Sequence, residues 1–311
     1  MKKRKSDFFL KTLREVGEIG VIKRIERSVK RRNRKMIADF GEDSAIFKVG
    51  KRFVAVSTDM GVAGTHFVSS NAEKIGSKIA VAANTDLLAK GALPRLMWLD
   101  IALPAKTPVF FVEKLYKGVD RQLSLLGAFL VGGDTNNAGE FCYSATVFGE
   151  VQFKPILRRN AKAGDVLVLS GEVGSASAGL FCVLNKKKCP KKFFDAQNTP
   201  ELNLNFCKKV MKYANAGVDV SDGMAKELND VAKQSGKKLV VDWDKIPFDK
   251  RLVSLCKENG WSLEDLLFHR GEDYQVIYSV PASKAGFVEQ AGGVVFGRVL
   301  IAKKKSGVGL F

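Results

Sequence analysis

Six aspartates of this chain stand in surroundings rich in glycine, serine or threonine, at or near the expected ends of helices and strands: Asp43, Asp59, Asp86, Asp134, Asp219 and Asp222. Carboxylate oxygens are the ligands that hard cations such as Mg²⁺ prefer. So many negative charges in one cleft would repel one another strongly without cations. If the fold brings these side chains together, the sequence therefore predicts a site for several divalent ions and a phosphate-bearing substrate.

One stretch, residues 53–67 (FVAVSTDMGVAGTHF), contains several of the groups that such a site needs. Its alternating apolar residues predict a buried strand, with Thr58 and Asp59 at the end of that strand. Glycines then allow a tight turn before His66. A carboxylate, hydroxyls and an imidazole in this order suit a metal–phosphate group, although ordinary strand ends also turn through aspartate and glycine.

Other enzyme chemistries lack support in the sequence. The chain has only two histidines and no evident Ser-His-Asp set, so we expect no acyl transfer and assign no covalent nucleophile. Neither the GxxxxGK[ST] phosphate loop nor the GxGxxG dinucleotide fingerprint occurs. Phosphoryl transfer fits best, because it depends on positioning and charge neutralisation more than on a covalent nucleophile.

Strands and helices alternate in both halves of the chain, which predicts a two-lobed protein of α/β or α+β class. An amphipathic helix is expected within residues 7–40. A second is expected from an Asn71 N-cap through Lys90, and a third over 109–126. In the second half, Ser221 is the expected N-cap of a helix that runs to Gly236.

Composition limits the partners and the compartment. The 311 residues include 51 Lys+Arg and 33 Asp+Glu, a formal charge of +18. This charge could attract nucleic acid or anionic substrates, but we favour a lysine-rich solvated surface, because no RNA-binding motif accompanies the basic runs. No apolar run approaches the ~18 residues of a membrane span, and no signal peptide is expected. Five scattered cysteines without a CxxC pair indicate buried thiols in a reducing cytoplasm, not a disulfide framework or a zinc site.

Eight segments occur in an order and spacing that resembles the thiamine-monophosphate kinase family, within the superfamily of aminoimidazole ribonucleotide synthetase and selenophosphate synthetase: GEDSA, VSTDMGVAGTHF, NTDLLAKGA, LVGGDT, RRNAKAGD, GEVGSASAGL, DVSDGM and GEDYQV. The resemblance implies an N-terminal α/β lobe (residues 1–152) that binds ATP and metal and pairs with a second copy in a dimeric β-barrel. It also implies a C-terminal α+β lobe (residues 153–311). The implied reaction transfers the γ-phosphoryl group of ATP directly to thiamine monophosphate, with several Mg²⁺ ions.

Carried over by position, the resemblance assigns three sets of residues. The implied metal ligands are Asp43, Thr58, Asp59, Asp86, Asp134, Asp219 and Asp222. The implied nucleotide contacts are Tyr116, Gly133, Asp134, Arg158 and Ser221. The implied contacts to the thiamine phosphate are His66 and Glu272.

Three positions depart from the family pattern. Glu42 replaces the first aspartate of a GDD motif, and Arg270 stands where a glycine usually precedes GEDY. Val308 stands where an aromatic residue is expected to pack on the thiamine. Two alternatives therefore remain: an ATP-dependent superfamily member with another small acceptor, or a non-catalytic relative that binds nucleic acid. The complete acidic set argues against the second, because unneeded repelling carboxylates would destabilise a cleft.

Overall fold

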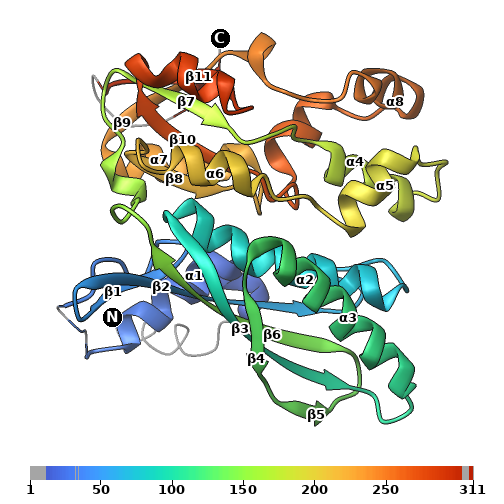
Figure 1. Ribbon diagram of the computed structural model, residues 1–311. Coiled ribbons are helices and arrows are strands. Elements are labelled where there is room, and N and C mark those ends of the chain that lie inside the picture. The colour runs from blue at the N-terminus through green and yellow to red at the C-terminus, as the bar shows by residue number, and fades with distance from the viewer. Residues whose placement is uncertain (1–11, 32, 34, 303–307, 311) are drawn as a thin grey trace, which may run out of the picture. The chain divides into compact units, whose positions relative to one another are not determined.

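The computed structural model describes residues 12–31, 33, 35–302 and 308–310 (Figure 1). Contacts divide the chain into two units, residues 1–36 and 37–311, which are described separately.

The first unit contains helix α1, Leu13–Ser28. Its N-terminus carries a capping box, in which Glu15 accepts the backbone N–H of Thr12 at 2.7 Å. Gly17, at φ +64°, kinks the helix. The helix is shorter than the 7–40 stretch in which it was expected, and residues 1–11 lie outside the described part of the chain.

The second unit has two β-sheets with their helices. Its helices and strands are, in chain order, β1 (Ala45–Val49), β2 (Arg52–Val62), α2 (Ala72–Ala89), β3 (Ala92–Leu103), α3 (Val109–Leu126), β4 (Phe129–Gly132), β5 (Thr135–Asn137), β6 (Cys142–Val151), β7 (Asp165–Leu169), α4 (Ser175–Leu184), α5 (Lys191–Asn198), α6 (Leu204–Val210), β8 (Ala216–Asp219), α7 (Met224–Ser235), β9 (Lys237–Val241), α8 (Arg251–Asn259), β10 (Val276–Pro281), α9 (Ala285–Gln290), β11 (Val294–Ile301) and β12 (Val308–Leu310).

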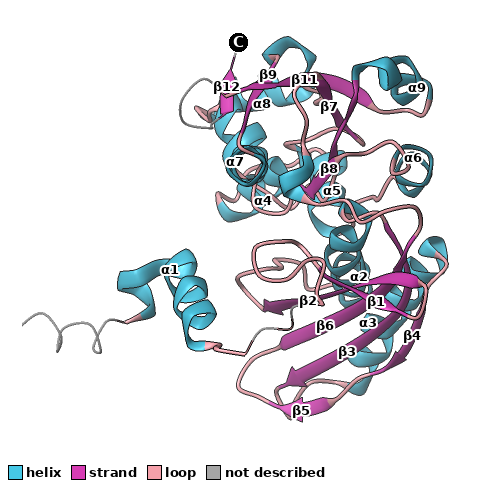
Figure 2. Ribbon diagram, turned by 90° about the vertical axis from the view of Figure 1, so that its left-hand side faces the viewer, coloured by secondary structure: helices cyan, strands magenta, loops and turns pink. Residues whose placement is uncertain are grey.

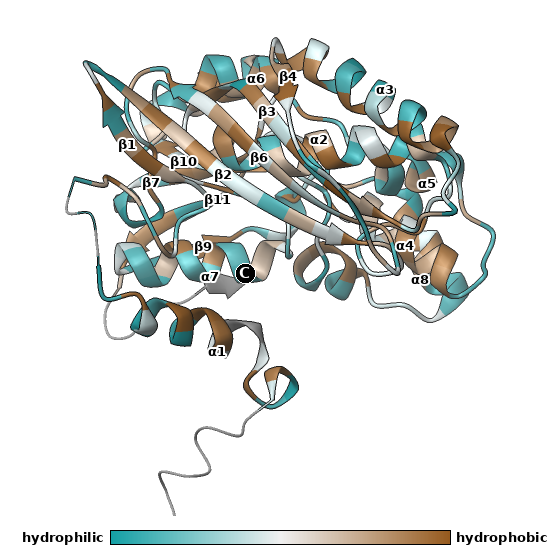
Figure 3. Ribbon diagram, turned by 90° about the horizontal axis from the view of Figure 1, so that it is seen from below, coloured by the Kyte–Doolittle hydropathy of each residue, from teal (hydrophilic) through white to brown (hydrophobic). Residues whose placement is uncertain are grey.

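The first sheet has the order β1-β2-β6-β3-β4, and β5 also pairs with β3. Helices α2 and α3 cover one face (Figure 2). The two helices approach closely because each has a glycine at the contact: a Cβ on Gly76 would lie 1.9 Å from the carbonyl oxygen of Leu115. Figure 3 shows the opposite face of this half-barrel sheet, where no helix of the second unit lies.

Helices α2 and α3 confirm two expectations. The Asn71 side chain caps α2 by accepting the N–H of Lys74, and Lys90 ends the helix. Helix α3 ends at Gly127, whose φ of +70° is in the left-handed region.

The prediction that strand β2 ends at Thr58 and Asp59 was wrong. Strand β2 continues to Val62, and Asp59 pairs with Ala145 in its middle. The reason is that β6 pairs with β2 from Val54 to Val62, so the polar residues do not break the strand. Because side chains alternate along a strand, Asp59 and Thr58 lie on opposite faces of the sheet.

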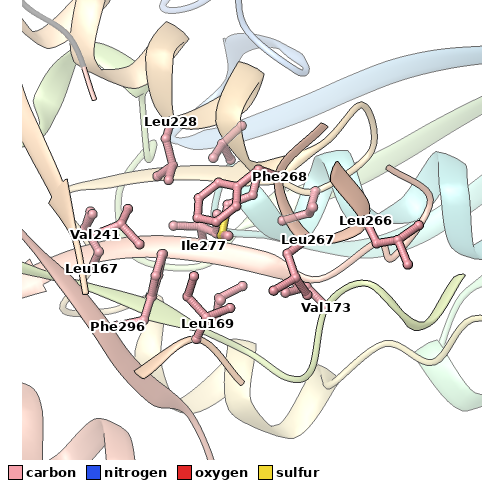
Figure 4. Close-up of a cluster of buried hydrophobic side chains, with 14 of the residues drawn as sticks. Leu167, Leu169, Val173, Leu228, Val241, Leu266, Leu267, Phe268, Ile277 and Phe296 are labelled. Carbon is pink, nitrogen blue, oxygen red and sulfur yellow. The ribbon is translucent and has the colours of Figure 1, made fainter. Parts of the chain in front are cut away.

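The second sheet has the order β12-β9-β11-β7-β10-β8 and packs on an apolar core. Figure 4 shows this core, in which Phe268 and Phe296 lie among side chains from the sheet and from α7. The C-terminal end of α2 packs against the second sheet, where the hydroxyl of Tyr278 donates to the carbonyl of Leu88 at 2.6 Å. Helix α2 therefore connects both sheets.

The predicted Ser221 cap of α7 was also wrong. The N-cap is Gly223, at φ +115°, and no side chain caps the helix. The Ser221 carbonyl instead accepts the N–H of Glu272 at 2.8 Å, so the backbone of Ser221 pairs with the 270–275 segment before the helix begins. The helix does end at Gly236, as predicted.

Both lobes have the mixed α/β content that the sequence predicted. The proposed domain boundary at 152/153 lies between the last strand of the first sheet, β6, and the first strand of the second, β7. All five cysteines are free, and three of them (Cys182, Cys207 and Cys256) are buried as predicted, whereas Cys142 and Cys189 are partly exposed.

Candidate active site

Three of the predicted carboxylates meet between the sheets. Asp43 precedes β1, Asp86 lies on α2, and Asp219 ends β8, and one oxygen of each lies within 4.8 Å of the others. Within the described residues this is the single group of three acids, cysteines or histidines that is close enough to hold a metal ion. We call these three residues the carboxylate cluster.

Negative charges crowd one another in the carboxylate cluster. Burial, together with the neighbouring carboxylates, raises the pKa of Asp86 and of Asp219 well above the ordinary value. Asp219 Oδ2 is buried without a hydrogen-bond partner. An unsatisfied buried carboxylate oxygen beside two others is a site that a hard divalent cation fits.

Asp43 differs from the other two because two cations contact it. Lys90 Nζ lies 2.8 Å from Asp43 Oδ2, and the Arg158 guanidinium contacts Asp43 Oδ1. Burial alone would raise the pKa of Asp43, but these two charges outweigh it and hold the pKa below the ordinary value. Arg158, an expected nucleotide contact, also pairs with the buried Glu227 at 3.0 Å.

Ser57, rather than Thr58, directs its hydroxyl toward the carboxylate cluster. Ser57 Oγ lies 2.5 Å from Asp86 Oδ2 and 2.9 Å from the Asp43 carbonyl oxygen. The Thr58 hydroxyl is on the other face of the sheet, 3.1 Å from that of Thr146. Strand alternation is the signal that would have identified Ser57 from the sequence, because it shares a face with Asp59.

Asp59 and Asp222 are not members of the carboxylate cluster. The Tyr143 hydroxyl donates to Asp59 Oδ2 at 3.4 Å, and burial raises the pKa of Asp59, with a smaller contribution from the negative charge of Asp222. Asp222 is exposed and forms an ion pair with Lys226.

The other implied nucleotide contacts lie elsewhere. Asp134 is exposed after β4 and accepts the N–H of Thr135 at 2.8 Å, outside the carboxylate cluster. Gly133 and Tyr116 both lie against Leu99: the Tyr116 hydroxyl donates to its carbonyl at 3.2 Å, and a Cβ on Gly133 would lie 1.9 Å from the same oxygen. Only glycine therefore fits at position 133. Ser221 is nearer the carboxylate cluster, because its hydroxyl oxygen lies 3.4 Å from Asp219 Oδ1.

The two implied acceptor contacts, His66 and Glu272, are brought together by a lysine that sequence analysis missed. Lys78 Nζ lies 3.2 Å from Glu272 Oε1 and donates to the His66 carbonyl at 3.1 Å. The other Glu272 oxygen accepts from Gln197 at 2.8 Å. Glu272 has a left-handed backbone, at φ +68°, which costs a non-glycine residue energy. The sequence did contain a signal for this contact: Lys78 is a charged residue beside Ile79 on the apolar stripe of α2, where a lysine needs an opposite charge.

A cavity of about 770 Å³ opens in the C-terminal lobe, beside α4 and α5. Asp273, Gln275, Asp195 and Lys192 are among its lining residues. Burial raises the pKa of Asp273 to about 7, although the N–H groups of Gly174 and Ala176 at the start of α4 bind it. None of the predicted site residues lines this cavity.

Comparison with known proteins gives the family. A model of the AIR synthase related protein, N-terminal domain, matches residues 41–151. Thiamine-monophosphate kinase of Nitrosopumilus maritimus is 30% identical over 285 residues, covering 89% of this chain and 87% of that one. The chain belongs to the thiamine-monophosphate kinase family. The Aquifex aeolicus thiamine-monophosphate kinase is 29% identical over 296 residues, with 91% and 94% covered.

The fold also agrees with this family. The solved structure described as AaThiL complexed with AMPPCP and TMP superposes with a TM-score of 0.87 and 28% identity, covering 97% of this chain and 96% of that one. No described helix is long and apolar enough to cross a membrane.

The departures from the pattern of the thiamine-monophosphate kinase family have structural roles in this chain. Glu42 contacts Lys90 at 2.6 Å and accepts the backbone N–H of Arg158 at 3.0 Å. Arg270 pairs with Asp265 at 2.9 Å. Val308 lies in β12, which pairs in parallel with β9.

Proposed function

We infer that the protein phosphorylates thiamine monophosphate with ATP, and we propose that Mg²⁺ held by the carboxylate cluster assists the transfer. The bond between the γ-phosphorus and the β-bridging oxygen of ATP breaks, and a phosphate oxygen of thiamine monophosphate bonds to that phosphorus. The products are ADP and thiamine diphosphate. The observation that carries the proposal is the convergence of three carboxylates, one with an unpartnered buried oxygen, in a member of this family.

The side chains of the site divide into two groups, one that would hold Mg²⁺ and one that would contact the acceptor. Bound Mg²⁺ would be held by Asp43, Asp86 and Asp219, and would neutralise phosphate charge that builds up in the transition state. We assign Asp59, from the first lobe, and Asp222, from the second, to further metal contacts, as the sequence resemblance implies. On the acceptor side, Lys78 offers a cation to a phosphate, and Glu272 offers a carboxylate to a cationic heterocycle. Thiamine monophosphate has both a phosphate and a thiazolium.

The test is a coupled assay of purified protein with ATP, Mg²⁺ and thiamine monophosphate. We expect thiamine diphosphate to form, and EDTA to abolish its formation. A panel of other phosphorylated acceptors tests specificity, because Val308 stands where the family pattern has an aromatic residue that is expected to pack on the thiamine. If ADP forms with another acceptor and never with thiamine monophosphate, the acceptor assignment is wrong; if no ADP forms with any, the kinase assignment is wrong.

A homodimer through the first sheet is part of the proposal. Its face away from α2 and α3 exposes large apolar side chains, with Met60 62% and Trp98 37% exposed, and Phe129 of β4 70% exposed. An apolar sheet face of this kind is typically covered by another layer. A second copy of the same half-barrel would cover it and complete the dimeric β-barrel that the sequence resemblance implies. The cytoplasmic location remains a prediction.

Replacing Trp98 by aspartate should give a monomer. A carboxylate in the middle of an apolar interface would have to lose its hydration, which costs several kcal/mol. Sedimentation velocity should show a dimer for the natural chain and a monomer for Trp98→Asp. The matched control is Val253→Asp, at an exposed apolar residue of α8 in the other lobe, which should remain dimeric. A natural chain that sediments as a monomer contradicts the proposal.

A further inference from the structure

Lys90 is a fully buried lysine at the end of α2. Its side chain is 0% exposed, and Nζ lies 2.6 Å from Glu42 Oε2 and 2.8 Å from Asp43 Oδ2. It also donates to the carbonyl oxygen of Gly217 at 2.9 Å. The ammonium group therefore donates two hydrogen bonds, to Glu42 and Gly217, and forms an ion pair with Asp43.

The partners of Lys90 belong to the segments that carry the carboxylate cluster. Lys90 ends α2, the helix of Asp86; Glu42 and Asp43 form the segment before β1; and Gly217 lies in β8, which ends at Asp219. One side chain thus connects the three segments, and its charge contacts one cluster member directly. Burying an ammonium group is costly unless opposite charges compensate it. The carboxylates of Glu42 and Asp43 provide this compensation for Lys90.

Glu42 sets how much of the Lys90 charge is available to the cluster. One ammonium faces two carboxylates, which leaves the three groups with a net charge of about −1 before Arg158 is counted. Removing the lysine would make this group more negative by one charge, and removing the charge of Glu42 would make it less negative by one. Glu42 itself is outside the carboxylate cluster.

We propose that Lys90 is a fixed internal cation of the metal site, a positioning residue that holds Asp43 in place and lowers the affinity of the carboxylate cluster for divalent ions. The proposal rests on the proposed function only in that the cluster binds such ions. It needs neither ATP nor a particular acceptor.

The test measures Mn²⁺ binding to the full chain without nucleotide, by titration calorimetry and by electron paramagnetic resonance of free Mn²⁺. Lys90→Met should bind Mn²⁺ roughly tenfold more tightly or take up an additional ion, because a unit charge a few ångströms away acts strongly in a partly buried site. Glu42→Gln should bind Mn²⁺ more weakly by a similar factor. The double variant Lys90→Met/Glu42→Gln should return toward the natural affinity.

Thermal unfolding separates the charge role from simple packing. We expect Lys90→Met to melt lower than the natural chain in EDTA and to regain more of its melting temperature with Mn²⁺ than the natural chain gains. A role in packing alone would lower the melting temperature equally in both conditions. The control Lys192→Met removes a lysine of α5 that pairs with Glu172 and Asp249, and should leave Mn²⁺ affinity unchanged.

Each outcome decides the proposal. Opposite shifts of Mn²⁺ affinity in Lys90→Met and Glu42→Gln support it, and unchanged affinity or shifts of the same sign overturn it. If Lys90→Met does not fold, Glu42→Gln decides alone: weaker binding supports the proposal, and natural affinity overturns it. A natural chain that binds no Mn²⁺ overturns both this inference and the proposed metal site, whereas failure with thiamine monophosphate alone leaves this inference standing.

Discussion

Asp219→Asn should abolish turnover while the metal-free protein becomes more stable. Asp219 Oδ2 is buried without a partner between two other carboxylates, so neutralising it removes repulsion and a desolvation cost. The same change removes a proposed ligand of Mg²⁺, and Mg²⁺ would stabilise the charge on the transferred phosphoryl group. We expect turnover to fall at least roughly a hundredfold, and the free energy of unfolding in EDTA to rise by about 1 kcal/mol.

The pH dependence of stability gives a second readout for Asp219. Its pKa is raised in the folded state, so the folded protein binds more protons than the unfolded chain at pH values above the unfolded pKa. The metal-free natural protein should therefore lose stability as the pH rises from about 4 through the raised pKa. Asp219→Asn should lose less, and Mg²⁺ should reduce the slope in the natural chain.

The control for Asp219→Asn is Asp242→Asn, at an exposed carboxylate that pairs with Lys245. Turnover and the pH profile of unfolding should both be natural in this control. If Asp219→Asn retains near-natural turnover, the carboxylate cluster is not the metal site.

Glu272→Gln should weaken acceptor binding and leave ATP binding unchanged. The substitution keeps the shape of the side chain but removes the negative charge that faces Lys78 and that we assign to the thiazolium. A close pair of opposite charges contributes roughly 1.5 kcal/mol or more, so the KM for thiamine monophosphate should rise at least roughly tenfold. Steady-state kinetics with each substrate varied in turn should show the KM for ATP within about twofold of natural.

The matched control for Glu272→Gln is Glu289→Gln, at an exposed residue of α9. It removes the same charge from the second lobe at another position and should leave both KM values unchanged. Equal increases in both KM values of Glu272→Gln would point to a general disturbance of the 270–275 segment, in which Glu272 and Tyr274 have left-handed backbones. That result would contradict the assignment to the acceptor.

Local signals in the sequence were sufficient to predict the boundaries of helices that are set by residues at their own ends. Asn71 and Gly127 end α2 and α3 as predicted, because a side-chain cap and a left-handed glycine act within a few residues. Asp43, Asp86 and Asp219 could be named as candidates from their small polar surroundings, but the same pattern also selected Asp59, Asp134 and Asp222, which are outside the carboxylate cluster. Strand β2 shows the limit, since its length depends on pairing with β6, about 80 residues away.

Only the tertiary structure decided which charges meet. Nothing near Lys90 in the sequence indicates that it contacts Glu42 and Gly217, which are 48 and 127 residues away. The helical period places Lys78 on an apolar stripe but cannot show that Glu272, from the other lobe, compensates it. Compensation of a buried charge requires contact within a few ångströms, and such contacts between distant segments depend on the packing of α2 against both sheets. The sequence therefore determined the candidate carboxylates, Arg158 and the family resemblance, and the packing of α2 determined that Lys90 and Lys78 accompany carboxylates from distant segments.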